Sequence, residues 1–212
     1  AMQAAVKIPV TVKHRIGIDG LEDYEHLRHF VQTVAATGCR TFIVHARIAI
    51  LQGLSPKENR DVPPLRYDDV YRLKAEFPQL EIHINGGIKT VADIERHWGA
   101  VDGAMVGREA YHNPWLLAQA LPLFGVDTLP TREAILEQYL DFAARELAEG
   151  VPLSQLTRHV LGLFQGLPGA RRWRQHISET AHRKGSGLEV VRDAAAFVYA
   201  AREEAAIARQ AG

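Results

Sequence analysis

Four short apolar runs recur along the first half of the chain, and each is followed by a stretch with helical spacing. The runs predict strands at residues 8–13, 41–45, 81–85 and 104–106. Apolar side chains three and four positions apart indicate three helices, which carry Leu27, Phe30, Val31 and Val34, then Val70, Leu73 and Phe77, and then Val91, Ile94 and Trp98. This alternation predicts a parallel sheet built from βα units, and so an α/β fold.

After about Gly125 the pattern contains helices only. Thr131 is a suitable N-cap for a helix that ends at about Ala148. Two apolar faces follow, Leu153, Leu156, Val160 and Phe164 on one helix and Ala170, Trp173, Ile177 and Ala181 on another. A last helix is expected at about 188–209. The sequence therefore predicts a first domain over residues 1–125 and a second, all-helical domain over 126–212.

Polar residues stand at or just after the end of each predicted strand: Lys13, His45, Asn85-Gly86-Gly87 and Gly107-Arg108. A (β/α)8 (TIM) barrel keeps its chemistry at the carboxyl ends of its strands, and it binds phosphate through loop amides and a helix N-terminus after the last two strands. We therefore expect these strands to be strands five to eight of a barrel.

Four strands cannot close a barrel of this kind, because the open sheet would leave two edges and an apolar face uncovered. Residues 1–6 also have the composition of a helix end, which indicates that the chain begins within a longer protein. The missing barrel half, or another chain, should complete the fold. The sequence does not define the oligomeric state.

Two glycine-bearing turns on neighbouring strands favour a phosphate site. Gly86, Gly87 and Gly107 let the backbone approach an anion closely, and the Arg108 guanidinium can bind phosphate oxygens in two places. One such turn alone would fit a tight strand-to-helix connection equally well, and a lone histidine is more often a core residue than a ligand. The position of Lys13 and His45 on adjacent strand ends favours the functional interpretation.

Overall charge is balanced, with 25 Lys and Arg residues against 25 Asp and Glu, so attraction to nucleic acid must be local. The segment from Arg158 to Lys184 holds six basic residues against one acid, Glu179. Arg171 and Arg174 lie three positions apart and should share the outer face of their helix, which suits phosphate backbones. The alternative is a solvated surface.

The connection from Ala46 to Arg66 is long and has little periodicity. Its prolines should stiffen it, so we expect an ordered substrate loop that contains Lys57 and Arg60. The single cysteine, Cys39, excludes an internal disulfide and a thiolate-rich metal site, and no metal site is expected. No apolar run approaches the ~18 residues of a membrane span, and a cytoplasmic setting fits best.

Several longer motifs together resemble the A-type tRNA-dihydrouridine synthases. They are residues 10–17 (VTVKHRIG), 45–47 (HAR), 54–60 with 63–65 (PPL), 85–88 (NGGI), 106–111 (VGREAY), 157–166 (TRHVLGLFQG) and 169–171 (GAR). The resemblance spans nearly the whole chain. It implies an FMN-binding (β/α)8 barrel followed by a helical tRNA-binding domain, and the NADPH-dependent, FMN-mediated reduction of D-loop uridines near positions 20 and 20a to 5,6-dihydrouridine.

The resemblance also implies roles for individual residues. Lys13 would face the flavin ring with His45 close by, and the ribityl phosphate would be held by Asn85, Gly86, Gly87, Gly107 and Arg108. Contacts with tRNA would come from Lys57, Arg60, Arg171 and Arg174. The family's catalytic, proton-donating cysteine falls in the missing barrel half, and Cys39 does not occupy its place. We therefore expect no catalytic residue in this chain and no activity from it alone.

Two other functions fit parts of the sequence. One is another FMN-dependent barrel oxidoreductase, such as a dihydroorotate dehydrogenase or an ene-reductase, although such an enzyme would not need the basic helical tail. The other is a flavin-free, non-catalytic tRNA-binding fragment that uses only the tail. Flavin binding and tRNA affinity would separate these hypotheses.

Overall fold

The computed structural model describes residues 1–210, which form two compact units that divide between Gly107 and Arg108. The first unit contains α1 (Met2–Ala5), β1 (Val12–Ile18), α2 (Tyr24–Ala35), β2 (Thr41–Ala49), the 3-10 helix η1 (Glu58–Arg60), α3 (Tyr67–Glu76), β3 (Glu81–Asn85), α4 (Val91–Glu95) and β4 (Gly103–Met105). The predicted domains at 1–125 and 126–212 stay predictions.

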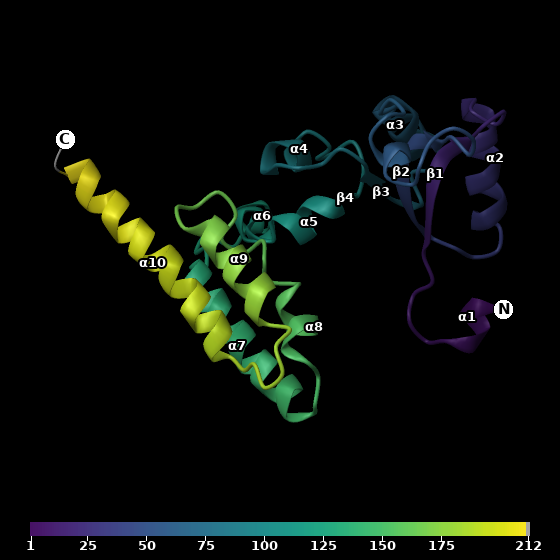
Figure 1. Cartoon of the computed structure of the whole chain (residues 1–212). Coiled ribbons are helices and arrows are strands. Elements are labelled where there is room, and N and C mark those ends of the chain that lie inside the picture. Colours follow the sequence, from purple (N-terminus) through teal and green to yellow (C-terminus); the bar gives the residue numbers. More distant parts are fainter. Residues whose placement is uncertain (211–212) are drawn as a thin grey trace. The chain divides into compact units, whose positions relative to one another are not determined.

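The four strands form one parallel sheet in the order β1-β2-β3-β4 (Figure 1). Each strand pairs with the next strand in the chain. Because parallel crossovers are right-handed, this order places successive helices on the same face of the sheet. The parallel α/β organisation expected from the sequence is confirmed.

The two faces of the sheet differ in burial. Phe42, Val44, Ile82 and Ile84 are fully buried on the face against which α3 packs. Side chains alternate along a strand, so the residues between them point to the opposite face. That face carries His45 and Asn85, together with Lys13, Arg15, Arg47 and His83. The sheet therefore has one apolar, helix-covered face and one face rich in polar and cationic side chains.

Strand β3 coincides with the predicted residues 81–85, but β1 and β2 do not end where the sequence predicted. Lys13 and His45 lie inside β1 and β2, which continue to Ile18 and Ala49. The two strands pair beyond these residues through an irregularity between Arg15 and Gly17. Strand length here depends on the neighbouring strand, so polar residues did not mark the ends.

The second unit is helical. It contains α5 (Arg108–His112), α6 (Trp115–Gln119), η2 (Leu121–Phe124), α7 (Arg132–Ala148), α8 (Leu153–Thr157), α9 (Ala170–Thr180) and α10 (Glu189–Gln210). Thr131 caps α7 by accepting a hydrogen bond from the Ala134 amide at 3.1 Å, as predicted. The long helix α10 packs against α9 (Figure 1). None of the helices within residues 1–210 is long and apolar enough to cross a membrane.

The core of this unit confirms both predicted apolar faces. Leu153, Leu156, Val160 and Phe164 are buried, as are Ala170, Trp173, Ile177 and Ala181. The first face does not belong to one helix, however, because α8 ends at Thr157 and turns follow. In the first unit, Phe30 and Trp98 are 42% and 60% exposed although they fit the helical spacing.

A substitution at Gly162 should destabilise the second unit. A Cβ atom there would lie 2.7 Å from the carbonyl carbon of His112 and 2.9 Å from Pro114 Cδ. We expect Gly162→Ala to lower the free energy of unfolding by about 1–3 kcal/mol, because backbone atoms cannot move aside cheaply. Urea unfolding followed by circular dichroism measures this loss.

Gly187→Ala is the matched control. The three atoms nearest to a Cβ there belong to the side-chain carboxylate of Glu189, which can move aside, so the stability of this variant should stay close to that of the parent. Equal stability of the Gly162 and Gly187 variants would contradict the close packing of this turn.

Candidate functional site

Lys13 and Asn85 are joined across the sheet, although 72 positions separate them in the chain. Lys13 Nζ donates a hydrogen bond to Asn85 Oδ1 at 3.1 Å, and Asn85 Nδ2 donates to the Met105 carbonyl at 2.7 Å. Asn85 is buried, with 9% of its surface exposed. Its amide therefore fixes both the ammonium group and the end of β4.

His45 lies against the first glycine of the neighbouring turn. His45 is level with Asn85 in the β2–β3 ladder, and a Cβ atom on Gly86 would lie 2.9 Å from His45 Cδ2. A side chain at position 86 would therefore collide with the imidazole. The structure brings together Lys13, His45, Asn85 and Gly86, four of the residues singled out in the sequence.

The Gly86-Gly87 turn is closed on one side by the chain before α3. Both glycines have positive φ, +117° and +72°. A Cβ on Gly87 would lie 2.6 Å from Leu65 Cδ1 and 2.9 Å from Tyr67 Oη. Glycine is required here both by backbone conformation and by space.

Backbone amides in both turns are available to an anion. Within residues 1–210, no protein acceptor takes the N–H of Gly87 or of Gly107. The space beside Gly107 is also open, because the nearest atom to a Cβ there would be Asn85 Nδ2 at 3.8 Å. An unpaired amide beside open space suits an anionic ligand such as a phosphate.

The helices that follow the two turns are shorter than the sequence suggested. α4 and α5 have five residues each, so their dipoles add little to anion binding. Arg108 begins α5 and belongs to the second unit, so its place at the phosphate stays a prediction. Loop amides and the cationic side chains of the sheet must provide most of the attraction.

Positive charge accumulates on the open face of β1 and β2. Burial, and then the nearby Arg15, lower the pKa of Lys13 below its usual 10.5. Burial, followed by Arg47 and Arg60, also lowers the pKa of Arg15. Lys13 and these arginines therefore form a cationic region beside the Asn85 amide.

Three residues of this region were not assigned as site residues from the sequence. Arg47 is 9% exposed, its Nη1 donates to the Arg60 carbonyl at 2.7 Å, and its buried Nε has no partner among the described residues. Arg15 Nη1 donates to the Ile48 carbonyl, and Tyr67 Oη donates to the Gly86 carbonyl. Arg15 and Arg47 follow Lys13 and His45 by two positions, and this strand period was the signal that could have found them.

The predicted substrate loop is partly strand. Its first residues, up to Ala49, belong to β2, and Asn59 holds the remainder by pairing with both backbone groups of Ile50. Lys57 and Arg60 have exposed side chains at η1. The loop is tied to the strand that it leaves, which agrees with the expectation of an ordered segment.

The basic tail residues lie in the second unit. Arg171 is exposed on α9, whereas Arg174 is half-buried and adjoins the face that Trp173 and Ile177 bury. Arg174 Nη1 donates to Gln165 Oε1 at 3.3 Å. In the described part of the chain, no carboxylate forms an ion pair with either arginine. The predicted outward orientation is confirmed for Arg171, while an RNA contact is not thereby tested.

Cys39 is remote from the polar face of the sheet. It is 4% exposed and precedes β2, and its Sγ lies near the carbonyls of Val10 and Thr41. This buried position on the amino side confirms its interpretation as a filler residue. No group of His, Cys, Asp and Glu residues within residues 1–210 is arranged to hold a metal ion.

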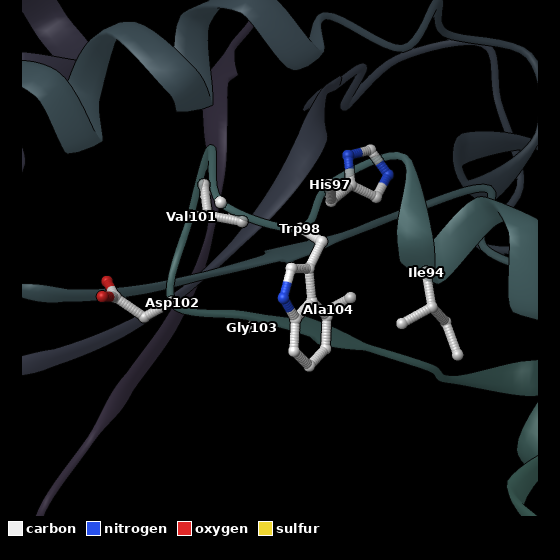
Figure 2. A pocket seen from close by; sticks show the side chains of 8 residues that line it. Ile94, His97, Trp98, Val101, Asp102, Gly103 and Ala104 are labelled. Atoms are coloured by element: carbon white, nitrogen blue, oxygen red, sulfur yellow. The ribbon is translucent and has the colours of Figure 1, made fainter. Parts of the chain in front are cut away.

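A cavity of about 210 Å³ lies elsewhere in the first unit, between the end of α4 and the start of β4 (Figure 2). It is lined by Ile94, His97, Trp98, Gly99, Val101, Asp102, Gly103 and Ala104. Among these lining residues the carboxylate is that of Asp102, which already contacts Lys74 Nζ at 2.7 Å and accepts a hydrogen bond from the Ile82 amide at 2.8 Å. The cavity offers few groups for chemistry, so the candidate site remains at the Asn85 end of β3.

Comparison with known proteins shows similarity to one enzyme family along nearly the whole chain. The sequence model of the dihydrouridine synthase (Dus) family matches residues 1–200. The tRNA-dihydrouridine(20/20a) synthase of Shewanella oneidensis is 54% identical over 194 residues, which are 91% of this chain and 58% of that protein. The enzyme of the same name from Vibrio cholerae is 52% identical over 201 residues, 93% of this chain and 62% of that protein.

The chain therefore spans about three-fifths of the length of these relatives. The matched residues include both glycine turns, the polar face of the sheet and nearly all of the helical unit. On this evidence the chain belongs to the dihydrouridine synthase family.

Proposed function

We propose that this chain carries the flavin-phosphate site and the RNA-binding tail of a tRNA-dihydrouridine synthase. The complete reaction is the NADPH-dependent, FMN-mediated reduction of D-loop uridines, at about positions 20 and 20a of tRNA, to 5,6-dihydrouridine. The observation that carries the proposal is that His45, Asn85 and Gly86 lie together at the ends of two neighbouring strands and that the Lys13 side chain reaches Asn85. We also propose that this protein acts in the cytoplasm.

In this proposal β1 to β4 are strands five to eight of a (β/α)8 barrel. The sequential strand order and the single helix-covered face support it, since a doubly wound sheet would reverse its order. The open edges of β1 and β4 would be completed by the other barrel half or by another chain. Residues 126–212 would serve as the helical tRNA-binding domain.

The residues present fit the phosphate of FMN. Gly87 and Gly107 offer unpaired amides, and Asn85 orders the strand end between them. Arg108 follows Gly107 directly and would add a guanidinium. When bound, FMN would supply the hydride that it receives from NADPH.

Lys13 and His45 would lie beside the flavin ring. The Lys13 ammonium, held by Asn85, would place a positive charge near the negative charge that a bound flavin gains on reduction. Uridine reduction also needs a proton donor, and the buried position of Cys39 excludes it from that role. The donor would therefore come from outside this chain, as the family resemblance implies.

The tRNA would be bound through its phosphates. Arg171 and Arg174 on α9, together with Lys57 and Arg60 at η1, are the proposed contacts. These cations carry no base-specific information, so they would position the tRNA and leave the choice of uridine to the active site.

A reconstitution experiment tests the proposal. We define the completed protein as this chain joined to the part of the Shewanella oneidensis relative that it does not match. The completed protein should bind FMN, measured by flavin absorbance, and form dihydrouridine in tRNA with NADPH. The 212-residue chain alone should form none, because it lacks the proton donor.

Each contrary result identifies a different error. Dihydrouridine formed by the chain alone would refute the claim that the proton donor lies outside this chain. Flavin binding without tRNA affinity would favour another FMN-dependent oxidoreductase. Binding of tRNA with no flavin in the completed protein would favour a non-catalytic tRNA-binding function.

A further inference from the structure

Tyr67, the first residue of α3, supports the glycine turn from behind. Its Oη donates a hydrogen bond to the Gly86 carbonyl at 2.7 Å. Burial, and then the nearby Asp93, raise the pKa of Tyr67 above its usual 10, so the hydroxyl keeps its proton at neutral pH. The phenol is therefore a permanent donor to this carbonyl.

Holding the Gly86 carbonyl fixes the direction of the next amide. The peptide between Gly86 and Gly87 is trans and planar, so its C=O and N–H point to opposite sides. The Gly87 N–H therefore points away from Tyr67. Two successive glycines with positive φ have wide conformational freedom, so this orientation needs support from outside the turn.

The ring of Tyr67 is itself held in place. It packs edge-on against His97, with ring centroids 4.6 Å apart, and His97 is 1% exposed. His97 Nδ1 is hydrogen-bonded to the hydroxyl of Tyr71 at 2.7 Å. Figure 2 shows the His97 and Trp98 rings on opposite sides of the chain, in agreement with the burial of the first and the exposure of the second.

We propose that Tyr67 is a positioning residue for the flavin phosphate: it holds the Gly86 carbonyl so that the Gly87 N–H is presented to the anion. The inference rests on the proposed function, because it needs FMN at this turn. Two observations carry it, the Tyr67–Gly86 hydrogen bond and the absence of a protein acceptor for the Gly87 N–H within residues 1–210. Tyr67 acts through the backbone and does not itself touch the ligand.

The test compares FMN with riboflavin, which lacks the phosphate, in the completed protein. Tyr67→Phe removes only the hydroxyl, so it should lower FMN affinity by about fivefold and leave riboflavin affinity unchanged. Tyr139→Phe is the matched control, because it removes a phenolic hydroxyl that likewise donates to a backbone carbonyl, that of Leu156 at 2.7 Å, but within the second unit. It should leave the ratio of FMN to riboflavin affinity at the parent value.

Three results would overturn the inference. The first is parental FMN affinity in Tyr67→Phe, and the second is an equal loss of FMN and riboflavin affinity, which would indicate a general structural role. The third comes from NMR of the parent protein, in which the Gly87 amide resonance should shift on addition of FMN and not of riboflavin. A Gly87 resonance that does not shift with FMN would exclude the contact. If the parent binds neither flavin, the proposed function itself fails, and that result is distinct from the first two.

Discussion

Replacing Lys13 by methionine should lower the rate of dihydrouridine formation by the completed protein about a hundredfold. Methionine has a similar length but removes the positive charge that Asn85 Oδ1 holds at 3.1 Å. Losing one pre-organised electrostatic group in an active site typically costs a factor of about 10² to 10³ in rate. Product is measured in tRNA after a timed reaction, and flavin absorbance shows whether FMN is retained.

The pH dependence of this rate gives a second measurement. Because burial and Arg15 lower the pKa of Lys13, its ammonium loses its proton at a lower pH than an ordinary lysine. The rate should therefore fall on the alkaline side with a midpoint below 10.5. In Lys13→Arg this fall should move to higher pH, since a guanidinium stays charged.

Lys7→Met is the matched control for Lys13→Met. Lys7 is exposed and precedes the same strand, so its loss should leave the rate unchanged. A Lys13→Met protein that keeps the parental rate would remove the ammonium from the proposed chemistry. An alkaline fall that is unchanged in Lys13→Arg would assign it to another group.

Removing Arg171 and Arg174 together should weaken tRNA binding about tenfold at moderate salt and flatten its salt dependence. Each phosphate contact releases condensed counterions, so the slope of log affinity against log salt should decrease by about two units in magnitude. Arg171 is exposed and Arg174 half-buried, and no carboxylate in the described part of the chain is ion-paired with them. Titration of tRNA at several salt concentrations measures both quantities.

The control is Arg145→Ala with Arg192→Ala, which removes the same charge from exposed positions on α7 and α10. This variant should keep most of the affinity and slope. Parental binding by the Arg171→Ala, Arg174→Ala protein would mean that the α9 surface is only solvated charge. The Lys57 and Arg60 loop would then be the next candidate.

Local sequence signals predicted the elements whose limits depend on their own residues. Strand β3 was predicted at its observed limits, and the Thr131 cap placed the start of α7. The inward face of α9 followed from helical spacing alone, because burial of Trp173 and Ile177 requires only that they recur on one side of a helix. The Gly86-Gly87 turn was also visible, since its conformation demands glycine.

Other features depended on distant parts of the chain. β1 and β2 extend past Lys13 and His45 because each strand supplies the other's hydrogen-bond partners. Phe30 and Trp98 satisfy a helical pattern but the described chain covers them only in part, leaving 42% and 60% of their surface exposed. A periodicity count cannot detect this, because it records which side chains share a face and not whether that face is covered.

By itself the sequence determined the parallel α/β pattern, the helical second unit, the family and the residue types of the candidate site. Only the tertiary structure decided that Lys13 reaches Asn85, that Arg47 is buried and bound to the Arg60 carbonyl, and that Tyr67 holds the Gly86 carbonyl. The physical reason is that strand and helix patterns are set by neighbours a few positions apart. Contacts between strands and across turns depend on register and packing, which no local pattern specifies.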